Sequence, residues 1–529
     1  MKPYSLYNDD VWNRYTEKFG KTPEEFQIKS YLHFDTPFNF LEKNKEIQAI
    51  VSDDSLTNVA QYAFLPFVKI LVKTPRYKYQ ENEQVYELET KIRPIAFASH
   101  FDTYLYGFYS FALTEKYQEY IKSRGFDDSI IAYRTDLSGK CNIQFAKEIF
   151  RKVKEFTSTG KTCTAIALDI KGYFDNIEHT ILKREWAKVL DQPELPIDQY
   201  TVFKSLTKYS YVNKNSVLRH FDIDLKISRK KWKCLLDLID NSIGGKTFQD
   251  KFNLLRRRRL ISLNLPKKEG GILSNRGIPQ GSPMSALLSN IYLIEFDEWL
   301  SELTKKRGWV YRRYCDDLII ICDTDAANDL YEEIKSKISN YKVKIQTQKT
   351  DIIEFKSNSK GKIRGVDKAE IDRRKISINA TNEQAYYKNL QYLGFEYNGS
   401  NIYIRHTSLS RYFRKAKGRI VKSVMMAYNN KSAVKKIYKK GIYEKYSHIG
   451  RRNFIQYARN AASKTYSNSR GVVREGMDSI SIKKQIAAHF SIIQSEVRKT
   501  SLSRFTNKTE KNQKRILLRK KTKKVIYKR

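Results

Sequence analysis

Two adjacent carboxylates, Asp316 and Asp317, end the segment Tyr314–Asp317, which has apolar residues on either side. Ionised carboxylates in such surroundings are costly unless a cation neutralises them. Neighbouring side chains on a regular strand point to opposite faces. A hairpin turn can break that alternation, so both carboxylates could approach one cation. Mg²⁺ suits them, because it prefers hard oxygen ligands and combines few protein carboxylates with substrate phosphates.

Asp169 offers a second source of ligands, since it ends an apolar run over residues 163–170 that predicts a buried strand. Three carboxylates holding two Mg²⁺ (or Mn²⁺) ions roughly 4 Å apart would suit in-line phosphoryl transfer. An alternative stays open, because a Tyr-x-Asp-Asp string arises by chance in about one such chain in ten. An exposed pair of aspartates in a turn is also ordinary.

Hydrophobic periodicity predicts the elements that would position these carboxylates. A helix is expected over 283–300, with its apolar residues on one side, and an amphipathic helix over 326–338. Two strands around a tight turn are expected over 311–322, and a further strand over 343–348. A strand pair, a helix and a further strand favour a split βαβ palm in an α+β fold over a doubly wound sheet.

The composition limits the class of protein. The chain has 529 residues, a net charge of +41 and 40% hydrophobic residues, too many for a disordered basic tail. Its length suggests three or four structural units at about 150 residues each. Such a basic protein is expected to bind a polyanion, usually nucleic acid. The longest apolar stretch, 62–72, contains Lys69 and is too short to span a membrane, and the first residues do not form a secretory signal.

The five cysteines are odd in number and form no C-x-x-C pair, which argues against a disulfide framework or a zinc finger. The histidines are scattered and add no metal-ligand spacing. The number and spacing of the cysteines favour a reducing compartment, and we expect a cytoplasmic protein.

The positive charge is concentrated after residue 400, where 35 basic and 5 acidic residues give +30. An apolar stripe over 413–427 predicts a helix there with one packed face. Its other face would track phosphates through the basic residues Arg411, Arg414, Lys415, Lys417, Arg419 and Lys422. The tail Lys511–Arg529 would either grip RNA or be a disordered solubilising end. Residues 356–375, polar and dotted with glycine, are predicted to be flexible.

Further segments accompany the carboxylates in a fixed order. They are Arg93-Pro94, Tyr133-Arg134, Asp169–His179, Gly277–Leu293, Gln346–Thr350 and Tyr392–Phe395. In this order they resemble the fingers and palm motifs of reverse transcriptases, over about residues 90 to 396. The resemblance implies an RNA-directed DNA polymerase, a nucleotidyltransferase, with the α+β right-hand fold of fingers, palm and a basic helical thumb.

The resemblance also divides the chain. It implies an N-terminal extension and fingers over 1–90, further fingers over 91–160, palm over 161–180 with the first catalytic aspartate, an insertion over 181–272, palm over 273–400, and thumb with tail over 401–529.

Roles follow from the same resemblance. Asp169, Asp316 and Asp317 match the catalytic metal ligands, and Lys349 the lysine that protonates pyrophosphate or stabilises its charge. Phe174 matches the ring that excludes a ribose 2′-hydroxyl, although it could be a core residue, and Lys349 could be a solvated strand-end lysine. Gln280 and Gly281 match the turn beside the nascent base pair. Arg93 and Arg134 could clamp the triphosphate, or form ion pairs instead.

The long insertion, with a tyrosine-rich string over 195–212, resembles the bacterial defence-associated (antiphage, abortive-infection) reverse transcriptases. This resemblance implies an RNA template, from a dedicated non-coding RNA, a DNA product made from dNTPs, and a possible homo-oligomer. The alternatives are a group II intron-like or retron-like reverse transcriptase, or an RNA-binding scaffold of the maturase kind. An RNA-dependent RNA polymerase is a third alternative, and Phe174 argues against it.

Overall fold

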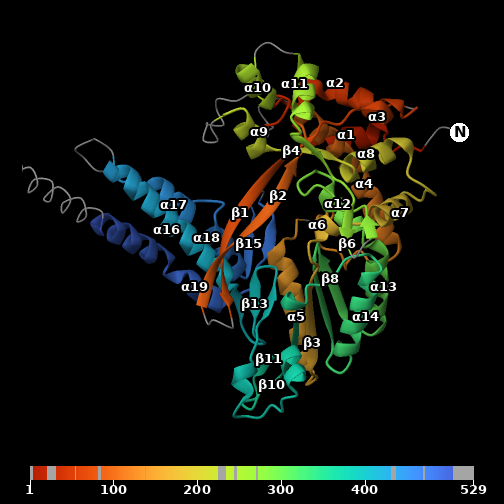
Figure 1. Cartoon of the computed structure of the whole chain (residues 1–529). Helices are drawn as coiled ribbons and strands as arrows, with labels where there is room; N and C mark the ends of the chain where they lie inside the picture. Colours follow the sequence, from red (N-terminus) through yellow and green to blue (C-terminus); the bar gives the residue numbers. More distant parts are fainter. Residues whose placement is uncertain are drawn as a thin grey trace, which may run out of the picture. The chain divides into compact units, whose positions relative to one another are not determined.

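The computed structural model describes residues 4–20, 31–53, 55–80, 85–137, 139–223, 234–243, 247–269, 272–429, 436–468 and 471–503 (Figure 1). The basic tail Lys511–Arg529 lies outside the described residues. The chain divides into two compact units. The first comprises Met1–Asp136, Leu168–Ile319 and Asn328–Thr350, and the second comprises Leu137–Ala167, Ile320–Ala327 and Asp351–Arg529.

The N-terminal part of the first unit is a helical layer with an aromatic core. Helices α1 (Asp9–Glu17), α2 (Phe40–Val51) and α3 (Thr57–Gln61) accompany the long helix α4 (His100–Ser123). The rings of Tyr15, Phe40 and Phe108 pack edge to face at about 6 Å between centroids. This layer buries the first half of α4, which therefore gives the first unit a rigid support.

A long antiparallel ribbon of β1 (Phe67–Gln80) and β2 (Val85–Phe97) follows in the first unit (Figure 1). It belongs to a four-stranded sheet of order β2-β1-β4-β5, with β4 (Ser210–Asn213) and β5 (Ile261–Leu263). The insertion between the expected palm segments is mainly helical. It contains α7 (His179–Val189), α8 (Ile197–Thr207), α9 (Lys214–His220), α10 (Leu235–Ile243), α11 (Phe248–Arg257) and the short hairpin β6 (Lys267–Glu269) and β7 (Ile272–Ser274).

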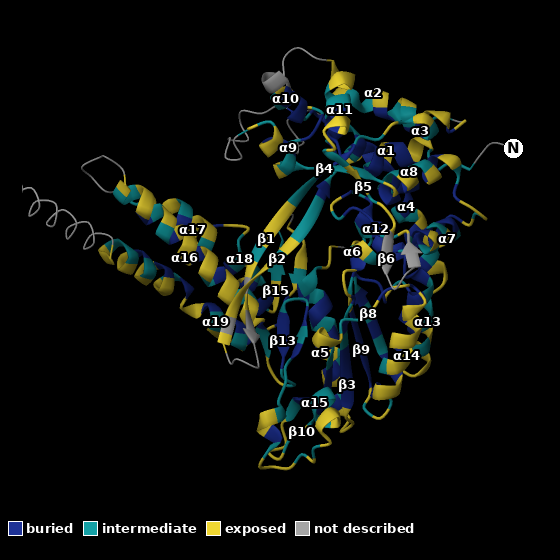
Figure 2. Cartoon of the chain, in the orientation of Figure 1, coloured by how far each residue is buried: buried dark blue, intermediate teal, exposed yellow. Residues whose placement is uncertain are grey.

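The central sheet has five strands in the order β11-β10-β3-β9-β8. They are β3 (Cys163–Asp169), β8 (Val310–Tyr314), β9 (Asp317–Asp323), β10 (Asp351–Ser357) and β11 (Ile363–Asp367). β3 pairs antiparallel with β10, and residues 318–322 of β9 are all buried (Figure 2). Continuous burial means that both faces of the sheet are covered. The α+β fold class with a split βαβ palm is confirmed.

Three of the predicted palm elements are confirmed. The strand over 163–170 is β3, the strand pair over 311–322 is the β8–β9 hairpin, and the helix over 326–338 is α14 (Ala327–Ser339). The predicted apolar side of α14 is buried at Leu330, Ile334 and Ile338. In the second unit, α5 (Asn142–Ser158) packs against β10.

The single helix predicted over 283–300 is wrong, because two helices are present. They are α12 (Ser285–Ile291) and α13 (Ile294–Lys306). Leu293 has φ −108° and ψ 22°, outside helical values, and the Tyr292 hydroxyl donates to the carbonyl of Tyr341. Tyr292 and Leu293 are both fully buried, so tertiary packing overrides the continuous apolar periodicity of the sequence.

The strand predicted over 343–348 is also wrong. Ile345 forms one bridge with Ile170, and the chain then enters the 3-10 helix η3 (Thr347–Lys349). The pairing stops because β3 has already ended at Asp169. This early turn has a consequence for the site, since it brings Lys349 back towards Asp169.

Residues 356–375 are ordered, contrary to the predicted flexible segment. They form the end of β10, the strand β11 and helix α15 (Lys368–Arg374). The Oδ1 atom of Asn358 accepts from the backbone N–H groups of Lys360 and Lys362, and Gly361 has φ +68°. The polar and glycine residues therefore build a tight hairpin turn.

The C-terminal part of the second unit contains a small sheet and a helical module. The sheet is β12 (Leu390–Tyr392), β13 (Phe395–Tyr397) and β14 (Ile402–Ile404), preceded by η4 (Glu383–Tyr386). The module contains α16 (His406–Asn429), α17 (Lys440–Tyr446), α18 (Phe454–Ala462), the hairpin β15 (Thr465–Ser467) and β16 (Val473–Glu475), and α19 (Ile480–Ala487). The predicted stripe of α16 is buried at Ala416, Ile420 and Val424. Among the described helices, none has the length and apolar character needed to cross a bilayer.

Candidate active site

Three chain segments of the first unit meet where β3 ends. Asp169 is the last residue of β3, Asp316 lies in the turn between β8 and β9, and Asp317 begins β9. The backbone N–H of Ile170 donates to the carbonyl of Asp316 at 3.0 Å, and that of Gln346 donates to the carbonyl of Asp169 at 2.8 Å. Main-chain hydrogen bonds thus hold the aspartate turn beside the end of β3.

The side chains at this junction interact electrostatically. The Lys349 ammonium forms an ion pair with Oδ2 of Asp169. Burial raises the pKa of Asp316, and the nearby charge of Asp169 raises it further, while Lys349 opposes this shift. Asp169 and Asp316 are therefore close enough for each charge to disfavour the other.

Asp317 is placed differently. Its side chain is exposed at the start of β9. Within the described parts of the chain, no three His, Cys, Asp or Glu side chains converge as a metal-binding group would. The structure thus brings together Asp169, Asp316 and Lys349, and Asp317 follows Asp316 directly at the start of β9.

The pair Asp169 and Asp316 fits a hard divalent cation in donor type and charge. Both side chains offer carboxylate oxygens, and their mutual repulsion would be relieved by a cation between them. Asp169 already accepts the ammonium group of Lys349, so a positive charge is favourable at this position.

Phe174 lies directly after the β3 end, in the short helix α6 (Tyr173–Asn176). Gly172 precedes this helix with φ +57°, a left-handed conformation that suits glycine. The Phe174 ring is half-buried, and its carbonyl accepts from the backbone N–H of Ile278 at 3.0 Å. The loop that contains Gln280 is therefore attached to the segment that carries Phe174.

Gln280 and Gly281 lie against strand β2. The Gln280 carbonyl accepts from the backbone N–H of Ala96 at 2.8 Å. Gly281 has φ +120°, and a Cβ atom added there would lie 2.8 Å from the Ala96 carbonyl oxygen and 2.9 Å from Cγ2 of Ile95. Glycine is required at position 281 for both conformation and space.

Arg93 lies on the same strand, three residues before Ala96, and its side chain is half-buried. In the parts of the chain that the structure describes, Arg93 has no ion-pair partner.

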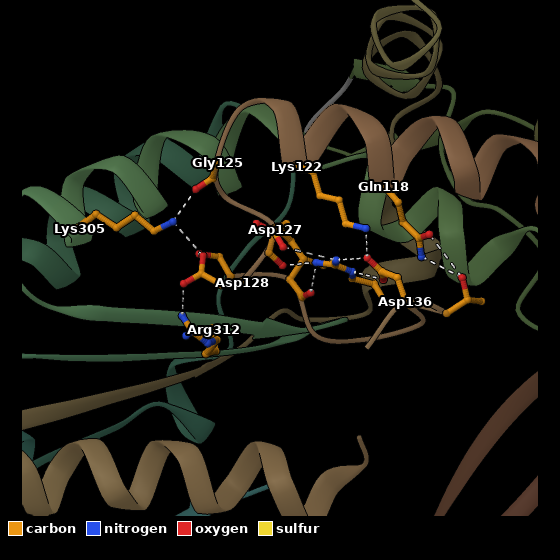
Figure 3. Close-up of polar contacts among 12 residues, drawn as sticks. Gln118, Lys122, Gly125, Asp127, Asp128, Asp136, Lys305 and Arg312 are labelled. Carbon is orange, nitrogen blue, oxygen red and sulfur yellow. Dashed lines mark hydrogen bonds and ion pairs between the residues drawn. The ribbon is translucent and has the colours of Figure 1, made fainter. Parts of the chain in front are cut away.

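Arg134 is engaged within the protein. Its side chain is 1% exposed, and it binds Asp136 through two contacts, from Nε at 2.9 Å and from Nη2 at 2.5 Å. Lys122 also contacts Asp136, at 2.9 Å (Figure 3). Nη1 of Arg134 donates to the carbonyl of Ile130 at 3.3 Å. This arrangement favours the ion-pair alternative for Arg134 over a triphosphate clamp.

Arg134→Ala should lower the free energy of unfolding by about 3 kcal/mol, because it leaves a mostly buried carboxylate without its bidentate partner. The midpoint of urea denaturation measures this loss. Arg124→Ala is the matched control, since Arg124 is 47% exposed in its pair with Glu298 and should change stability by no more than about 0.5 kcal/mol. Equal losses in the two variants would contradict a structural role specific to Arg134.

The same pair predicts a pH dependence. Although burial raises the pKa of Asp136, its contacts with Arg134 and Lys122 lower it to about 2. The ionised form is favoured in the folded state, so this contribution is complete above about pH 4 and disappears as the pH falls towards 2. Asp136→Asn should reduce that acid-side loss of stability.

The basic residues predicted to contact nucleic acid lie on α16 in the second unit. All six are exposed, whereas Ala416, Ile420 and Val424 of the same helix are buried. They are Arg411, Arg414, Lys415, Lys417, Arg419 and Lys422. Lys417 has an acidic partner, Glu496, at 3.3 Å.

Sequence reasoning missed one buried group, Arg313 on β8. Arg313 is 0% exposed and forms an ion pair with Asp297 of α13, which is also 0% exposed. A signal was present, because Arg313 occupies an inward position, two residues from Tyr311, in a strand with alternating burial. A charge at such a position needs a buried partner.

Residues 244–397 match the family described as reverse transcriptase (RNA-dependent DNA polymerase). The chain therefore contains a reverse transcriptase domain, and the enzyme class of this domain is RNA-directed DNA polymerase, a nucleotidyltransferase. The matched segment includes Asp316, Asp317 and Lys349. Asp169 and Phe174 lie outside it, and the hydrogen bonds and ion pair described above connect them to it.

Solved structures similar to this chain include telomerases from two Candida species. Telomerase from Candida albicans in complex with a TWJ fragment of telomeric RNA is 11% identical, with 91% of this chain and 68% of that chain covered and a TM-score of 0.35. Apo telomerase from Candida tropicalis is 10% identical, with 96% and 70% covered and a TM-score of 0.36. Its form truncated from the C-terminal domain is 11% identical, with 70% and 61% covered and a TM-score of 0.31.

This chain thus spans 61–70% of the length of these telomerases. Similarity at this level defines neither the fold nor the function. No curated protein matched the sequence.

Proposed function

We propose that this protein synthesises DNA on an RNA template by nucleotidyl transfer at Asp169, Asp316 and Asp317. One observation carries the proposal: the segment after Asp169, outside the matched domain, is bonded to the Asp316 turn inside it. Two carboxylates from distant parts of the sequence thereby share one site with Lys349. That arrangement suits phosphoryl transfer supported by divalent cations.

Each residue contributes through its position. Bound divalent cations, Mg²⁺ or Mn²⁺, would neutralise the reacting phosphate oxygens and activate the primer 3′-hydroxyl. Asp169 and Asp316 would hold them, and Asp317 would join by a rotation of its exposed side chain. Lys349, which is 47% exposed and pairs with Asp169, would stabilise the charge of the leaving pyrophosphate.

Four residues would bind the incoming dNTP. Phe174 follows the β3 end, where its half-buried ring would meet the sugar. The loop at Gln280 and Gly281 offers close backbone approach to the base pair. Arg93 would bind phosphate through its guanidinium group.

Nucleic acid is expected on the exposed basic face of α16. Replacing Arg411, Lys415 and Lys422 together by Gln should reduce the slope of log affinity against log salt by about 2 for single-stranded RNA, because each phosphate contact contributes roughly 0.7. Fluorescence anisotropy at several salt concentrations measures the slope. As a control, Arg373 and Arg374 of α15 already pair with Glu370, and their replacement by Gln should leave the slope unchanged. An unchanged slope in the α16 variant would remove this face from the binding surface.

We propose further that the protein acts in bacterial antiphage defence, in the cytoplasm, on a dedicated non-coding RNA. The long helical insertion and its tyrosine-rich string support this assignment over a group II intron-like or retron-like enzyme. The five cysteines are free, which is consistent with a reducing compartment. A homo-oligomer belongs to the same proposal.

Purified protein with Mg²⁺, dNTPs and its co-purified RNA should produce DNA. Sequencing of this DNA should show that it was copied from that RNA. Replacing dNTPs by rNTPs tests the RNA polymerase alternative, which requires the opposite preference. The scaffold alternative requires that defence against phage survives Asp169→Asn and Asp316→Asn in cells. Defence that survives both substitutions would therefore exclude DNA synthesis as its basis.

A further inference from the structure

The Arg313 guanidinium group is enclosed by acceptors on three sides. Its Nε donates to Oδ1 of Asp297 at 2.7 Å, and Nη2 donates to the other oxygen of the same carboxylate and to the Asn290 carbonyl at 3.2 Å. Nη1 donates to the carbonyl of Cys315 at 3.1 Å and faces Oδ1 of Asn290 at 3.4 Å. The donors of one buried side chain thus connect α12 and α13 with the turn that carries Asp316.

That turn contains an unfavourable backbone conformation. Cys315 has φ +59°, in the left-handed region, and it is not a glycine. Such a conformation costs on the order of 1–2 kcal/mol and persists only where the surroundings impose it. The Cys315 side chain is buried, with its Sγ 3.8 Å from Oγ of Ser289. Its carbonyl is fixed by Arg313.

The two peptide groups on either side of Asp316 are therefore both held. The carbonyl of Cys315 belongs to the peptide before Asp316 and accepts from Arg313. The carbonyl of Asp316 belongs to the peptide after it and accepts from the N–H of Ile170. When both flanking peptide planes are fixed, the direction of the Cα–Cβ bond of Asp316 is fixed as well.

We propose that Arg313 is a positioning residue that aims the Asp316 carboxylate at the cation shared with Asp169. This inference rests on the proposed function and adds to it a residue that touches neither cation nor substrate. The alternative is that Arg313 and Asp297 form only a core ion pair. Both views predict lost stability on truncation, so stability alone does not separate them.

Arg313→Lys separates the two views. Lysine keeps the charge and can reach Asp297, but its single ammonium group cannot also donate to the Cys315 carbonyl in the planar geometry of guanidinium. Tyr311→Phe is the matched control, because the Tyr311 hydroxyl donates to the same Asp297 oxygen at 2.6 Å without touching the turn. It perturbs the ion pair and leaves the Arg313–Cys315 bond in place.

The experiment measures Mn²⁺ binding by electron paramagnetic resonance without dNTPs, alongside the Mg²⁺ dependence of DNA synthesis. We expect Arg313→Lys to weaken Mn²⁺ binding and lower kcat by about 10–100-fold, the range for partners that orient metal ligands, with KM for dNTP changed less than about twofold. Tyr311→Phe should bind Mn²⁺ like the parent protein. Wild-type Mn²⁺ affinity in Arg313→Lys, or an equal loss in Tyr311→Phe, would overturn the inference.

Two controls make the result interpretable. If Arg313→Lys does not fold, the pair Arg313→Gln with Asp297→Asn replaces it, because this pair leaves no unpaired buried charge and still cannot reproduce the full set of hydrogen bonds. The same outcomes apply to it. A parent protein that binds Mn²⁺ in an Asp316-dependent way but makes no DNA would contradict the proposed function, while the binding comparison would still decide the role of Arg313.

Discussion

Asp316→Asn should reduce DNA synthesis by about 100–1,000-fold, while the protein remains folded and keeps its affinity for RNA. The substitution preserves size but removes the negative charge at the β8–β9 turn, and losses of 10²–10³ are typical when one preorganised electrostatic group is removed from a site. Primer extension on an RNA template measures the rate. Asp325→Asn is the matched control, since Asp325 is exposed just after β9 and should retain full activity. More than about a tenth of wild-type activity in Asp316→Asn would remove Asp316 from the chemistry.

The direction of the pKa shift of Asp316 makes the melting temperature a second readout for the Asp316→Asn variant. Burial and the charge of Asp169 raise the pKa of Asp316, so this group binds its proton more tightly in the folded protein than in the unfolded chain. Stability from this group is therefore greatest at low pH and decreases as the pH rises through the raised pKa. At neutral pH, Asp316→Asn should keep or increase the melting temperature while activity is lost. Activity that is lost together with stability would indicate unfolding.

Phe174→Val should allow incorporation of ribonucleotides. The carbonyl of Phe174 accepts a hydrogen bond from Ile278, and under the proposed function its ring faces the sugar, so a smaller side chain would open space there. The ratio of kcat/KM for dNTP over rNTP should fall by about 10–200-fold, the discrimination that one apolar contact provides. Single-nucleotide incorporation with matched dNTP and rNTP measures this ratio.

Tyr173→Phe is the control for that experiment. The Tyr173 ring is buried next to Phe174, and its hydroxyl donates to the Ser289 carbonyl at 2.5 Å. Removing this hydroxyl perturbs the same helix without enlarging the space near the sugar, so the ratio should stay at its wild-type value. An unchanged ratio in Phe174→Val would support the alternative that Phe174 is a core residue.

The elements that the sequence predicts well are those with a strong periodic pattern. β3, the β8–β9 hairpin and α14 each combine an apolar run or stripe with a clear end, and all three are present. The break at Leu293 has no such signal, since neither proline nor glycine marks it and buried apolar residues continue from α12 through Leu293 into α13. Residues 356–375 have the composition of a loop, yet backbone hydrogen bonds to Asn358 and pairing with β10 order them.

The candidate site also contains some features that the sequence predicts and others that it does not. Asp169, Asp316 and Lys349 are recognisable from residue type and order, and the structure brings them together. The partner of Arg134, Asp136, lies only two residues further along the chain, but the almost complete burial of the Arg134 side chain is not visible in the sequence. The left-handed backbone at Cys315 is equally hidden, because it results from contacts with Arg313 and Ser289 that are formed only in the folded protein.

The close fit of Gly281 against β2 also determines how this region can move. The Ala96–Gln280 hydrogen bond connects strand β2 to the loop, and the lack of space for a Cβ atom at Gly281 means that the two backbones pack in direct contact. Arg93 is on the same strand, so a shift of β2 that repositions its guanidinium group displaces the loop in the same direction. If Arg93 binds the triphosphate and this loop contacts the nascent base pair, as we propose, then nucleotide binding and base-pair alignment are coupled through β2.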